Sequence, residues 1–304
     1  MPTTELRKEA PPQSLKQRVA SYLPLSLRRH IIYRRRKGQW GNFRHPSLYS
    51  EKMQWRIIND RRPMIGLTGD KLASAELAVQ RCLEAGAPLT RARILASDGD
   101  PQRLIASLRQ LDQAGQLPTA WVLKPNHSSG RVLITQGAPD WDVIQESARR
   151  WLLPDDMVGV SWMWPYSLAR RLIIAEELIT DGGKQALEWS VFIFGGKAHF
   201  YNCKVRESGE VKDTWRSTAW GDLGRMLRRE RKILPLDKTP EYLPVITACA
   251  EAIGKGWDHV RVDLYWADGK AWFGETTAYP MEGTGFASKE VDVELGHLWK
   301  LHES

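Results

Sequence analysis

The sequence predicts an α+β fold, and three observations support this. Helix-like and strand-like patterns both occur along the chain, without the strict strand–helix–strand order of a doubly wound parallel sheet. Near the C-terminus, residues 260–266 and 272–277 alternate apolar and polar side chains around a turn, which is typical of an antiparallel hairpin. A chain of 304 residues can also bury a large core and hold two or three subdomains.

Amphipathic spacing of apolar residues predicts helices at residues 50–60, 72–85, 103–113, 141–153 and 241–254. Asp70 is well placed to cap the second of these helices, and Gly86 to end it. We expect strands at 172–178, 189–194 and 198–205, and a strand–loop–strand over 120–135. Residues 207–237 are polar and basic, and we expect an insertion loop there.

Positive charge is concentrated in the N-terminal fifth of the chain. The net charge is +8, but residues 1–62 carry 15 Lys and Arg against 4 Asp and Glu. The excess is densest over residues 28–37, in a segment that Pro11, Pro12 and Pro24 interrupt, so we expect residues 1–39 to be loosely attached. Such a segment can contact an acidic polymer or a membrane surface, or it can be a solvated helix. It lacks the interleaved aromatic residues of a base-stacking platform, so we expect no specific nucleic acid partner.

Several classes of protein are excluded by composition. No apolar run approaches the roughly 18–20 residues of a membrane span. The N-terminal residues lack the apolar core of a secretion signal. Cys82, Cys203 and Cys249 have no metal-type spacing and are odd in number, which argues against zinc or disulfide frameworks. We therefore expect a cytoplasmic protein, which the basic segment could place at the inner face of the membrane.

The C-terminal hairpin carries acidic residues whose positions depend on its register. A two-residue turn at Asp268 and Gly269 would send Asp263 and Glu275 to opposite faces. A three-residue loop over 267–269 would keep them together, with Glu275 opposite Arg261 and about 7–8 Å diagonally from Asp263. We predict the second register, because such carboxylates suit Mg²⁺, which prefers oxygen ligands. The alternative is a solvated hairpin with a cross-strand salt bridge.

Two further segments suggest nucleotide contacts. In WVLKPNHSSGRVL, Lys124 at a strand end can meet a phosphate, and the small loop Ser128–Gly130 can bring backbone amides close to an anion. In IIAEELI, the apolar run ends at Glu176 and Glu177, which suits a hinge along an adenine edge. Each segment also has a plainer interpretation, as an ordinary hairpin and as a strand ending in solvated glutamates.

Taken in order, these segments resemble the ATP-grasp superfamily of carboxylate–amine ligases, particularly its D-alanine–D-alanine ligase-like members. The stretches SLYSEKMQWRIINDRRPMIGLTGDK and VRVDLYWADGKAWFGETTAYP look closest to the TupA-like branch, named for teichuronopeptide biosynthesis. The resemblance implies the ATP-grasp fold, in which a nucleotide is held between two α+β subdomains with antiparallel sheets. It implies a basic segment at 1–39, an N-terminal subdomain at 40–117, a central lid subdomain at 118–178 and a C-terminal subdomain with the metal site at 179–304.

The resemblance also assigns roles to individual residues. Phosphate contacts would come from Lys71, Lys124 and Lys204, although Arg206 competes for the last role, and Ser128, Ser129 and Gly130 would form a mobile loop over them. Glu176 and Glu177 would lie at the adenine hinge, and Glu188 at the ribose.

The metal site implied by the resemblance departs from the family pattern at one position. Asp263 and Glu275 would hold two Mg²⁺ ions, and Arg261 would stabilise charge on the transferred phosphoryl group. Many ATP-grasp enzymes have asparagine two residues after the metal-bridging glutamate, where this chain has Thr277. The threonine hydroxyl can still meet a metal or its water.

These roles imply a ligase that uses ATP to join a carboxylate to an amine through an acyl phosphate. The amine would be an amino acid, and the setting would be surface-polysaccharide or peptide-conjugate biosynthesis. Two alternatives remain open: a kinase on the same fold that phosphorylates a hydroxyl, and a non-catalytic module whose basic segment binds nucleic acid or membrane.

Overall fold

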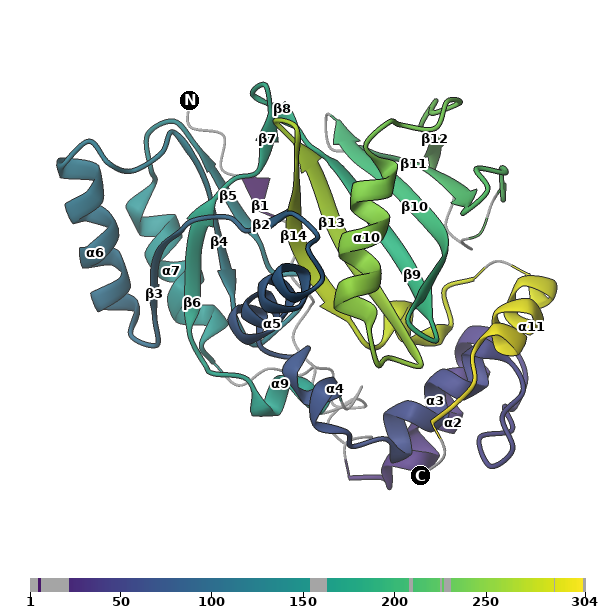
Figure 1. Ribbon diagram of the computed structural model, residues 1–304. Coiled ribbons are helices and arrows are strands. Elements are labelled where there is room, and N and C mark those ends of the chain that lie inside the picture. Colours follow the sequence, from purple (N-terminus) through teal and green to yellow (C-terminus); the bar gives the residue numbers. More distant parts are fainter. Residues whose placement is uncertain are drawn as a thin grey trace. The chain divides into compact units, whose positions relative to one another are not determined.

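The computed structural model describes residues 5–6, 22–153, 163–207, 210–224, 226, 231–286 and 288–302. The described chain divides into two compact units, between which it passes several times (Figure 1). Unit 1 lies within Met1–Pro24, Arg62–Ala73 and Ala92–Leu178, and unit 2 within Leu25–Arg61, Ser74–Arg91 and Ile179–Ser304. The four subdomains expected from the sequence remain a prediction.

Unit 1 contains a sheet of five strands covered by helices. Its strands are β1 (Glu5–Leu6), β3 (Ile94–Asp98), β4 (Ala120–Pro125), β5 (Leu133–Gln136) and β6 (Ile173–Glu177). Its helices are α4 (Pro63–Leu67), α6 (Pro101–Gln113), α7 (Trp141–Trp151), α9 (Pro165–Leu168) and the first residues of α5 (Lys71–Glu84). The strand order is β1-β5-β4-β6-β3, and each neighbouring pair is antiparallel.

The core of unit 1 lies between this sheet and helices α6 and α7. Leu104 and Leu108 of α6 and Ile144 of α7 are buried against Trp121 and Leu123 of β4. Both helices begin at aspartates whose side chains accept hydrogen bonds from backbone amides in the first turn. The amphipathic pattern read from the sequence is therefore the packing face of each helix.

Unit 2 contains a larger mixed sheet. Its strands are β2 (Leu89–Thr90), β9 (Leu187–Phe194), β10 (Lys197–Glu207), β11 (Glu210–Ser217), β12 (Lys232–Ile233), β13 (His259–Ala267) and β14 (Lys270–Thr277). Its helices are α2 (Leu25–Lys37), α3 (Tyr49–Asn59), the rest of α5, α10 (Leu243–Gly254), the short 3₁₀ helix η1 (Pro280–Gly283) and α11 (Lys289–Leu298). Strands β7 (Thr180–Asp181) and β8 (Lys184–Gln185) form a separate small hairpin.

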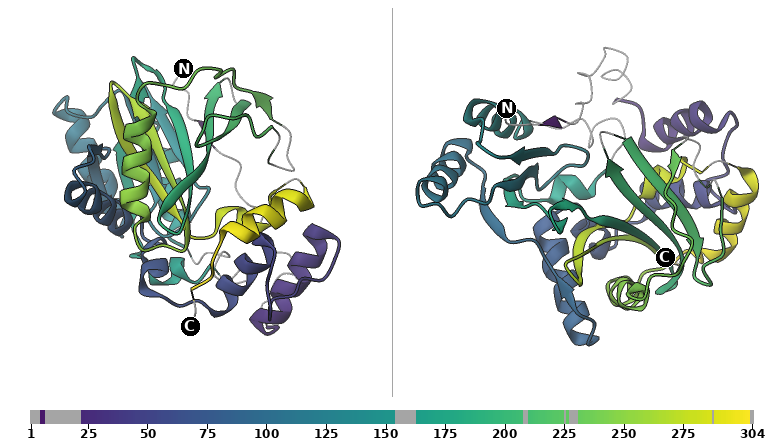
Figure 2. Two further views of the ribbon diagram at one scale, coloured as in Figure 1. Left: turned by 45° about the vertical axis from the view of Figure 1, so that its right-hand side comes forward. Right: turned by 90° about the horizontal axis from the view of Figure 1, so that it is seen from above.

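The sheet order in unit 2 is β12-β11-β10-β9-β13-β14-β2, with parallel pairing only at its two edges. Helix α10 lies along one face of the sheet (Figures 1 and 2). Val260, Val262 and Leu264 of β13 and Val191 of β9 are fully buried. Because side chains alternate along a strand, the residues between them face the other side of the sheet, which is where the polar side chains gather. The expected α+β class is confirmed.

Two expectations about loops are wrong. Residues 210–217 form strand β11, which pairs with β10 along its whole length, so only part of 207–237 is loop. Residues 25–37 form helix α2, which packs in unit 2 instead of being loosely attached; residues 7–21 of the same segment lie outside the described part of the chain. No helix among the described residues is both long and apolar enough to cross a membrane.

Candidate active site

The β13–β14 hairpin brings together the four polar residues that the sequence placed on one face. Asp263 lies directly opposite Glu275, and Arg261 directly opposite Thr277. Residues opposite each other in an antiparallel pair share a face, with Cβ atoms about 4.5–5.5 Å apart. Asp263 is 3% exposed, whereas the other three side chains are half-buried. The arginine, the two carboxylates and the threonine therefore form one cluster.

The turn and register predicted for this hairpin are both wrong. Asp268 and Gly269 form a two-residue turn with φ of 48° and 70°, and Ala267 pairs with Lys270. A regular ladder from this turn would leave Glu275 on the face away from Asp263. Instead, a β-bulge skips Gly274, which brings Glu275 opposite Asp263 rather than opposite Arg261. The bulge therefore places Asp263 and Glu275 on one face of the hairpin, which is the result that the predicted three-residue loop would have had.

Only glycine fits at the bulge without moving the site. A Cβ atom built on Gly274 would lie 2.8 Å from the carbonyl oxygen of Asp263 and 3.0 Å from the Tyr265 ring. Real Cβ atoms do not approach backbone oxygen so closely, so a side chain there would displace the strand that carries Asp263. A lone glycine within a strand pattern is the sequence signal for such a bulge.

Arg261 holds the carboxylate of Asp263 from within the same strand. Its Nε lies 2.9 Å from Oδ1, and its Nη2 lies 2.6 Å from Oδ2 and 3.3 Å from the hydroxyl of Thr277. Burial alone would raise the pKa of Asp263, but the charges of Arg261 and Lys204 outweigh it and lower that pKa. Burial likewise opposes the charge of Arg261, yet Asp263 and Glu275 raise its pKa. Both groups are therefore charged at neutral pH.

The neighbouring strands extend the polar cluster across the sheet. Glu188 on β9 lies opposite Lys204 on β10, and their side chains form an ion pair of 2.8 Å. The Lys204 ammonium also donates to the Ser190 hydroxyl at 3.1 Å, and Ser190 hydrogen-bonds to Asp263. This arrangement favours Lys204 over Arg206 as the cation of the site. Sequence reasoning missed Ser190, although its position two residues after Glu188 places both on one face of β9.

The cluster suits a magnesium ion that also binds phosphate. Asp263, Glu275 and Thr277 offer oxygen donors only, and Mg²⁺ commonly binds through one or two carboxylates together with substrate phosphates and water. No group of three or more His, Cys, Asp or Glu side chains that could hold a metal occurs in the part of the chain that the structure describes. A metal here would therefore share its coordination with a ligand, and would compete with Arg261 for Asp263.

Unit 1 contains the two lysines and the small loop that were predicted to contact phosphate, and the two lysines have different partners. Lys71 begins α5, and its ammonium contacts the carbonyl oxygen of Ser128. Lys124 projects from β4 and contacts the carboxylate of Glu176 on β6. Ser128 is buried, whereas Ser129 and Gly130 are exposed, with Gly130 at φ 80°. The loop therefore presents its exposed tip beside a lysine.

The predicted hinge residues differ in their contacts. Glu176 faces Lys124, whereas Glu177 pairs with Arg93 at 2.7 Å near the surface. The backbone amide of Glu177 donates to the Arg93 carbonyl at 3.0 Å. This N–H group, which a hinge could offer to an adenine edge, is therefore already hydrogen-bonded within the protein. The hinge assignment remains a prediction.

A buried hydrogen-bond network joins the residue Asn126, just before the Ser128–Gly130 loop, to the start of α5 and to Arg170. The Asn126 side chain, which is fully buried, accepts from the amide of Leu72 at 3.0 Å and donates to the carbonyl of Arg170 at 3.0 Å. Asp70 caps α5 through the amide of Ala73 and binds the Arg170 guanidinium through both oxygens, at 2.8 and 2.9 Å. The sequence predicted the cap. It did not predict the hydrogen bonds of Asn126 and Arg170 that fix the start of α5, and with it Lys71, beside the loop.

We expect Asp70→Asn to keep the helix cap and lose the ion pair, which should lower the free energy of unfolding by about 1.5–3 kcal/mol at neutral pH. Burial opposes the charge of Asp70, but Arg170 and the backbone donors outweigh it and lower its pKa below the usual 3.8. A lowered pKa stabilises the fold above that value, and the gain is lost as the pH falls through the folded-state pKa. Urea denaturation should therefore show a constant difference between the two proteins from neutral pH to pH 5, shrinking below 3.8. A difference that grows on acidification would contradict this account.

Comparisons with known proteins agree with this combination of features. A sheet face with paired carboxylates, an arginine and a lysine offers oxygen ligands suited to a metal and cations suited to an anionic ligand. The TupA-like ATP-grasp family model matches residues 107–300, which is more than half of the chain. The chain therefore belongs to the TupA-like ATP-grasp family, and the resemblance seen in the sequence is confirmed. No curated protein matches the sequence.

Among solved structures, similarity is distant. The ATP-grasp ligase PsnB, complexed with a phosphomimetic variant of its minimal precursor, Mg and ADP, is 14% identical over 82% of this chain and 64% of its own, with a TM-score of 0.39. D-alanine–D-alanine ligase from Bacillus anthracis, complexed with ATP, is 17% identical over 70% and 56%, with a TM-score of 0.37. N5-carboxyaminoimidazole synthase from Aspergillus clavatus is 15% identical over 80% and 54%, with a TM-score of 0.40. This chain spans between 54% and 64% of the length of these proteins, and the family assignment rests on the family model.

Proposed function

We propose that the protein is an ATP-dependent ligase that joins a carboxylate to an amine through an acyl phosphate. The observation that carries this proposal is the pairing of Asp263 with Glu275 on one sheet face, beside Arg261 and Lys204, in a chain of the TupA-like ATP-grasp family. Such a face concentrates the groups that phosphoryl transfer requires, which are oxygen ligands for a metal and cations for phosphate oxygens.

Each unit holds residues for which we propose a nucleotide contact. In unit 1, Lys71 and Lys124 would release Ser128 and Glu176 and bind phosphate oxygens, with the tip of the 128–130 loop beside them. In unit 2, Glu188 would accept from the ribose and Lys204 would bind phosphate. Each of these cations already contacts an oxygen acceptor, so phosphate would replace one charge-assisted interaction with another.

The residues of the hairpin would position the reacting groups. Asp263 and Glu275 would hold two Mg²⁺ ions, with Thr277 near the second, and bound Mg²⁺ would supply Lewis-acid stabilisation of the phosphates. Arg261, which contacts Asp263 in this structure, would bind the transferred phosphoryl group. The substrate carboxylate oxygen then attacks the γ-phosphorus and ADP leaves. The amine attacks the acyl carbon, phosphate leaves, and the amine loses a proton as the amide forms.

An amino acid amine and a carboxylate of a surface polysaccharide or peptide conjugate are the substrate classes that we propose. The name of the TupA-like branch motivates this setting. We also propose that the enzyme works in the cytoplasm, where ATP is supplied.

A phosphate-release screen tests the proposal. Amino acids would be offered together with uronates or short peptides, each with Mg²⁺ and ATP, and products would be analysed by mass spectrometry. We expect phosphate release only when a carboxylate and an amine are both present, and a product with the mass of their amide. ADP formation with a phosphorylated hydroxyl product would instead identify a kinase, and binding to nucleic acid without any ATP turnover would identify a non-catalytic module.

A further inference from the structure

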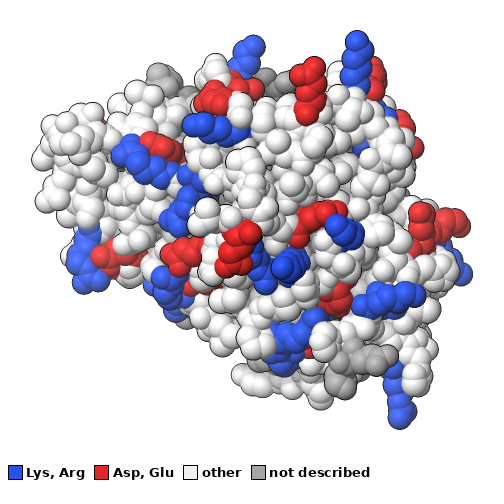
Figure 3. Space-filling view, viewed as in Figure 1, with Lys and Arg blue, Asp and Glu red and all other residues white. Residues whose placement is uncertain are grey.

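The basic residues of α2 divide into two sets with different environments. On the face of the molecule shown in Figure 3, basic and acidic side chains are interspersed. One set of α2 side chains turns inward to acidic partners within unit 2. The other set faces solvent. The difference decides which residues are available to a partner.

The inward set fastens α2 to the rest of unit 2. Arg29 is fully buried, and its guanidinium donates to Gln54 at 2.6 Å and to Glu282 at 2.8 Å. Arg36 also pairs with Glu282, at 3.2 Å, and Lys37 pairs with Asp292 at 2.8 Å. Removing one partner of a buried charge pair destabilises a protein strongly, so Arg29 and Lys37 are committed to the fold, whereas the Arg36 side chain is 42% exposed.

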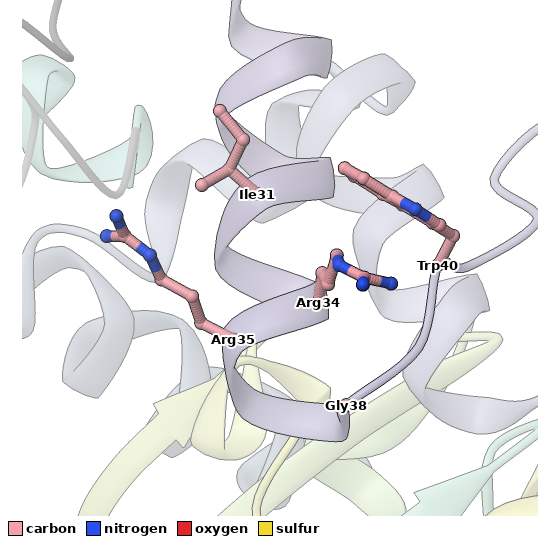
Figure 4. Close-up of a pocket in the computed structure, with 5 residues that line it drawn as sticks. All are labelled: Ile31, Arg34, Arg35, Gly38 and Trp40. Carbon is pink, nitrogen blue, oxygen red and sulfur yellow. The ribbon is translucent and has the colours of Figure 1, made fainter.

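The outward set combines charge with exposed apolar surface. Leu27, Ile31, Arg34 and Arg35 follow the spacing of one helical face. Leu27 is 45% exposed, and Trp40, just after the helix, is 58% exposed. Ile31, Arg34, Arg35, Gly38 and Trp40 line a pocket, in which Arg34 lies beside the Trp40 ring and Arg35 extends from the other side of the helix (Figure 4).

The two outward arginines have no acidic partner among the described residues. Among the residues that the structure describes, no carboxylate forms an ion pair with Arg34 or Arg35; the Arg34 guanidinium lies 5.1 Å from the centroid of the Trp40 ring. Exposed cations beside a stacked tryptophan and a row of aliphatic side chains make a surface that is both cationic and apolar.

We propose that the outer face of α2, defined as Leu27, Ile31, Arg34, Arg35 and Trp40, docks on the surface of an anionic lipid bilayer. This inference goes beyond the proposed ligase activity and does not depend on it. Interfacial helices combine basic residues with Leu and Trp side chains that enter the boundary between headgroups and acyl chains. Tryptophan is favoured at that depth because its ring is apolar and its N–H is polar.

A bilayer fits this face better than a hydrated acidic polymer does. An acidic polymer would neutralise the arginines but would leave Leu27 and the ring of Trp40 in water. A bilayer interface accepts both the charges and the apolar side chains. The apolar exposure on the same face as the unpaired cations therefore selects the lipid surface.

Vesicle co-sedimentation of the full chain tests this proposal. We expect binding to phosphatidylcholine vesicles that contain phosphatidylglycerol, weak binding to phosphatidylcholine alone, and release at high salt. The double variant Arg34→Gln/Arg35→Gln should bind about 30-fold more weakly, which corresponds to about 1 kcal/mol for each arginine near an anionic surface. Trp40→Ala should also weaken binding, because the apolar contribution is lost.

The matched control is Lys184→Gln/Lys270→Gln, which removes the same charge from exposed positions away from α2. It should bind vesicles like the wild type, and circular dichroism should show that all variants are folded. An equal loss in the control would overturn the proposal, because binding would then depend on total charge alone. Binding to soluble polygalacturonate that Arg34→Gln/Arg35→Gln weakens, without vesicle binding, would overturn it in favour of an acidic polymer.

Discussion

Asp263→Asn is expected to lose nearly all ATP-dependent phosphate release, by a factor of about 10²–10³ or more, as when a single stabiliser of transition-state charge is removed. The substitution keeps the shape of the side chain and an acceptor for Arg261, but it removes the negative charge that lies opposite Glu275. An uncharged amide oxygen binds Mg²⁺ more weakly than a carboxylate does, because it contributes no negative charge to the site. Turnover should be measured across a range of Mg²⁺ concentrations with the acceptor pair found in the screen, and more Mg²⁺ should restore little activity.

A loss of folding must be separated from a loss of chemistry in this variant. Asp263 is almost fully buried and pairs with Arg261, so its neutral substitute also leaves a guanidinium with a weaker partner. Glu275→Gln supplies the second measurement, because Glu275 is only half-buried and shares the same face. We expect both variants to remain cooperatively folded in thermal melts and both to be inactive. Full activity in either folded variant would show that these carboxylates do not hold the metal.

Gly274→Ala is expected to reduce turnover by about 100-fold, because displacement of a catalytic group by about 1 Å can cost that much. The added methyl group would meet the Asp263 carbonyl oxygen at 2.8 Å and force strand β13 or β14 to move. The loss should appear mainly in kcat. Steady-state kinetics with varied ATP and varied acceptor would separate the effect on kcat from the effect on KM.

Gly269→Ala is the matched control for the bulge variant. Gly269 has φ 70° in the turn of the same hairpin, and no atom lies within 4 Å of a Cβ built there. Alanine at this position should lower stability by about 1 kcal/mol through backbone strain, without displacing Asp263. Equal losses of turnover in both variants would mean that general weakening of the hairpin explains the effect and that the bulge does not position Asp263.

Local patterns in the sequence predicted much of the secondary structure. The helix at 103–113 and the Asp70 cap of the 72–85 helix were both found, because apolar spacing and capping residues act over a few residues. Loops were predicted less well. The polar composition of 207–237 suggested an insertion, but β11 is largely half-buried and lies between β10 and β12 in the sheet of unit 2. Composition alone does not reveal such a partner.

The chemistry of the candidate site could be read from the sequence, because residue identity decides which groups can bind magnesium or phosphate. Arg261, Asp263 and Glu275 were chosen on that basis, and they do share one face. How they come to share it was decided by the tertiary structure. The period of a strand is two residues, so one skipped glycine reverses the face of every residue beyond it, and the packing of neighbouring strands selects where that skip occurs.

In the basic segment, too, the sequence decides which groups are present and the tertiary structure decides where they lie. Its charge was evident from the sequence, but which arginines are available was not. Arg29 is buried against Glu282, which is 253 residues further along the chain, whereas Arg34 and Arg35 face solvent. A buried charge needs a partner to offset its lost hydration, and only the folded chain brings so distant a partner into contact.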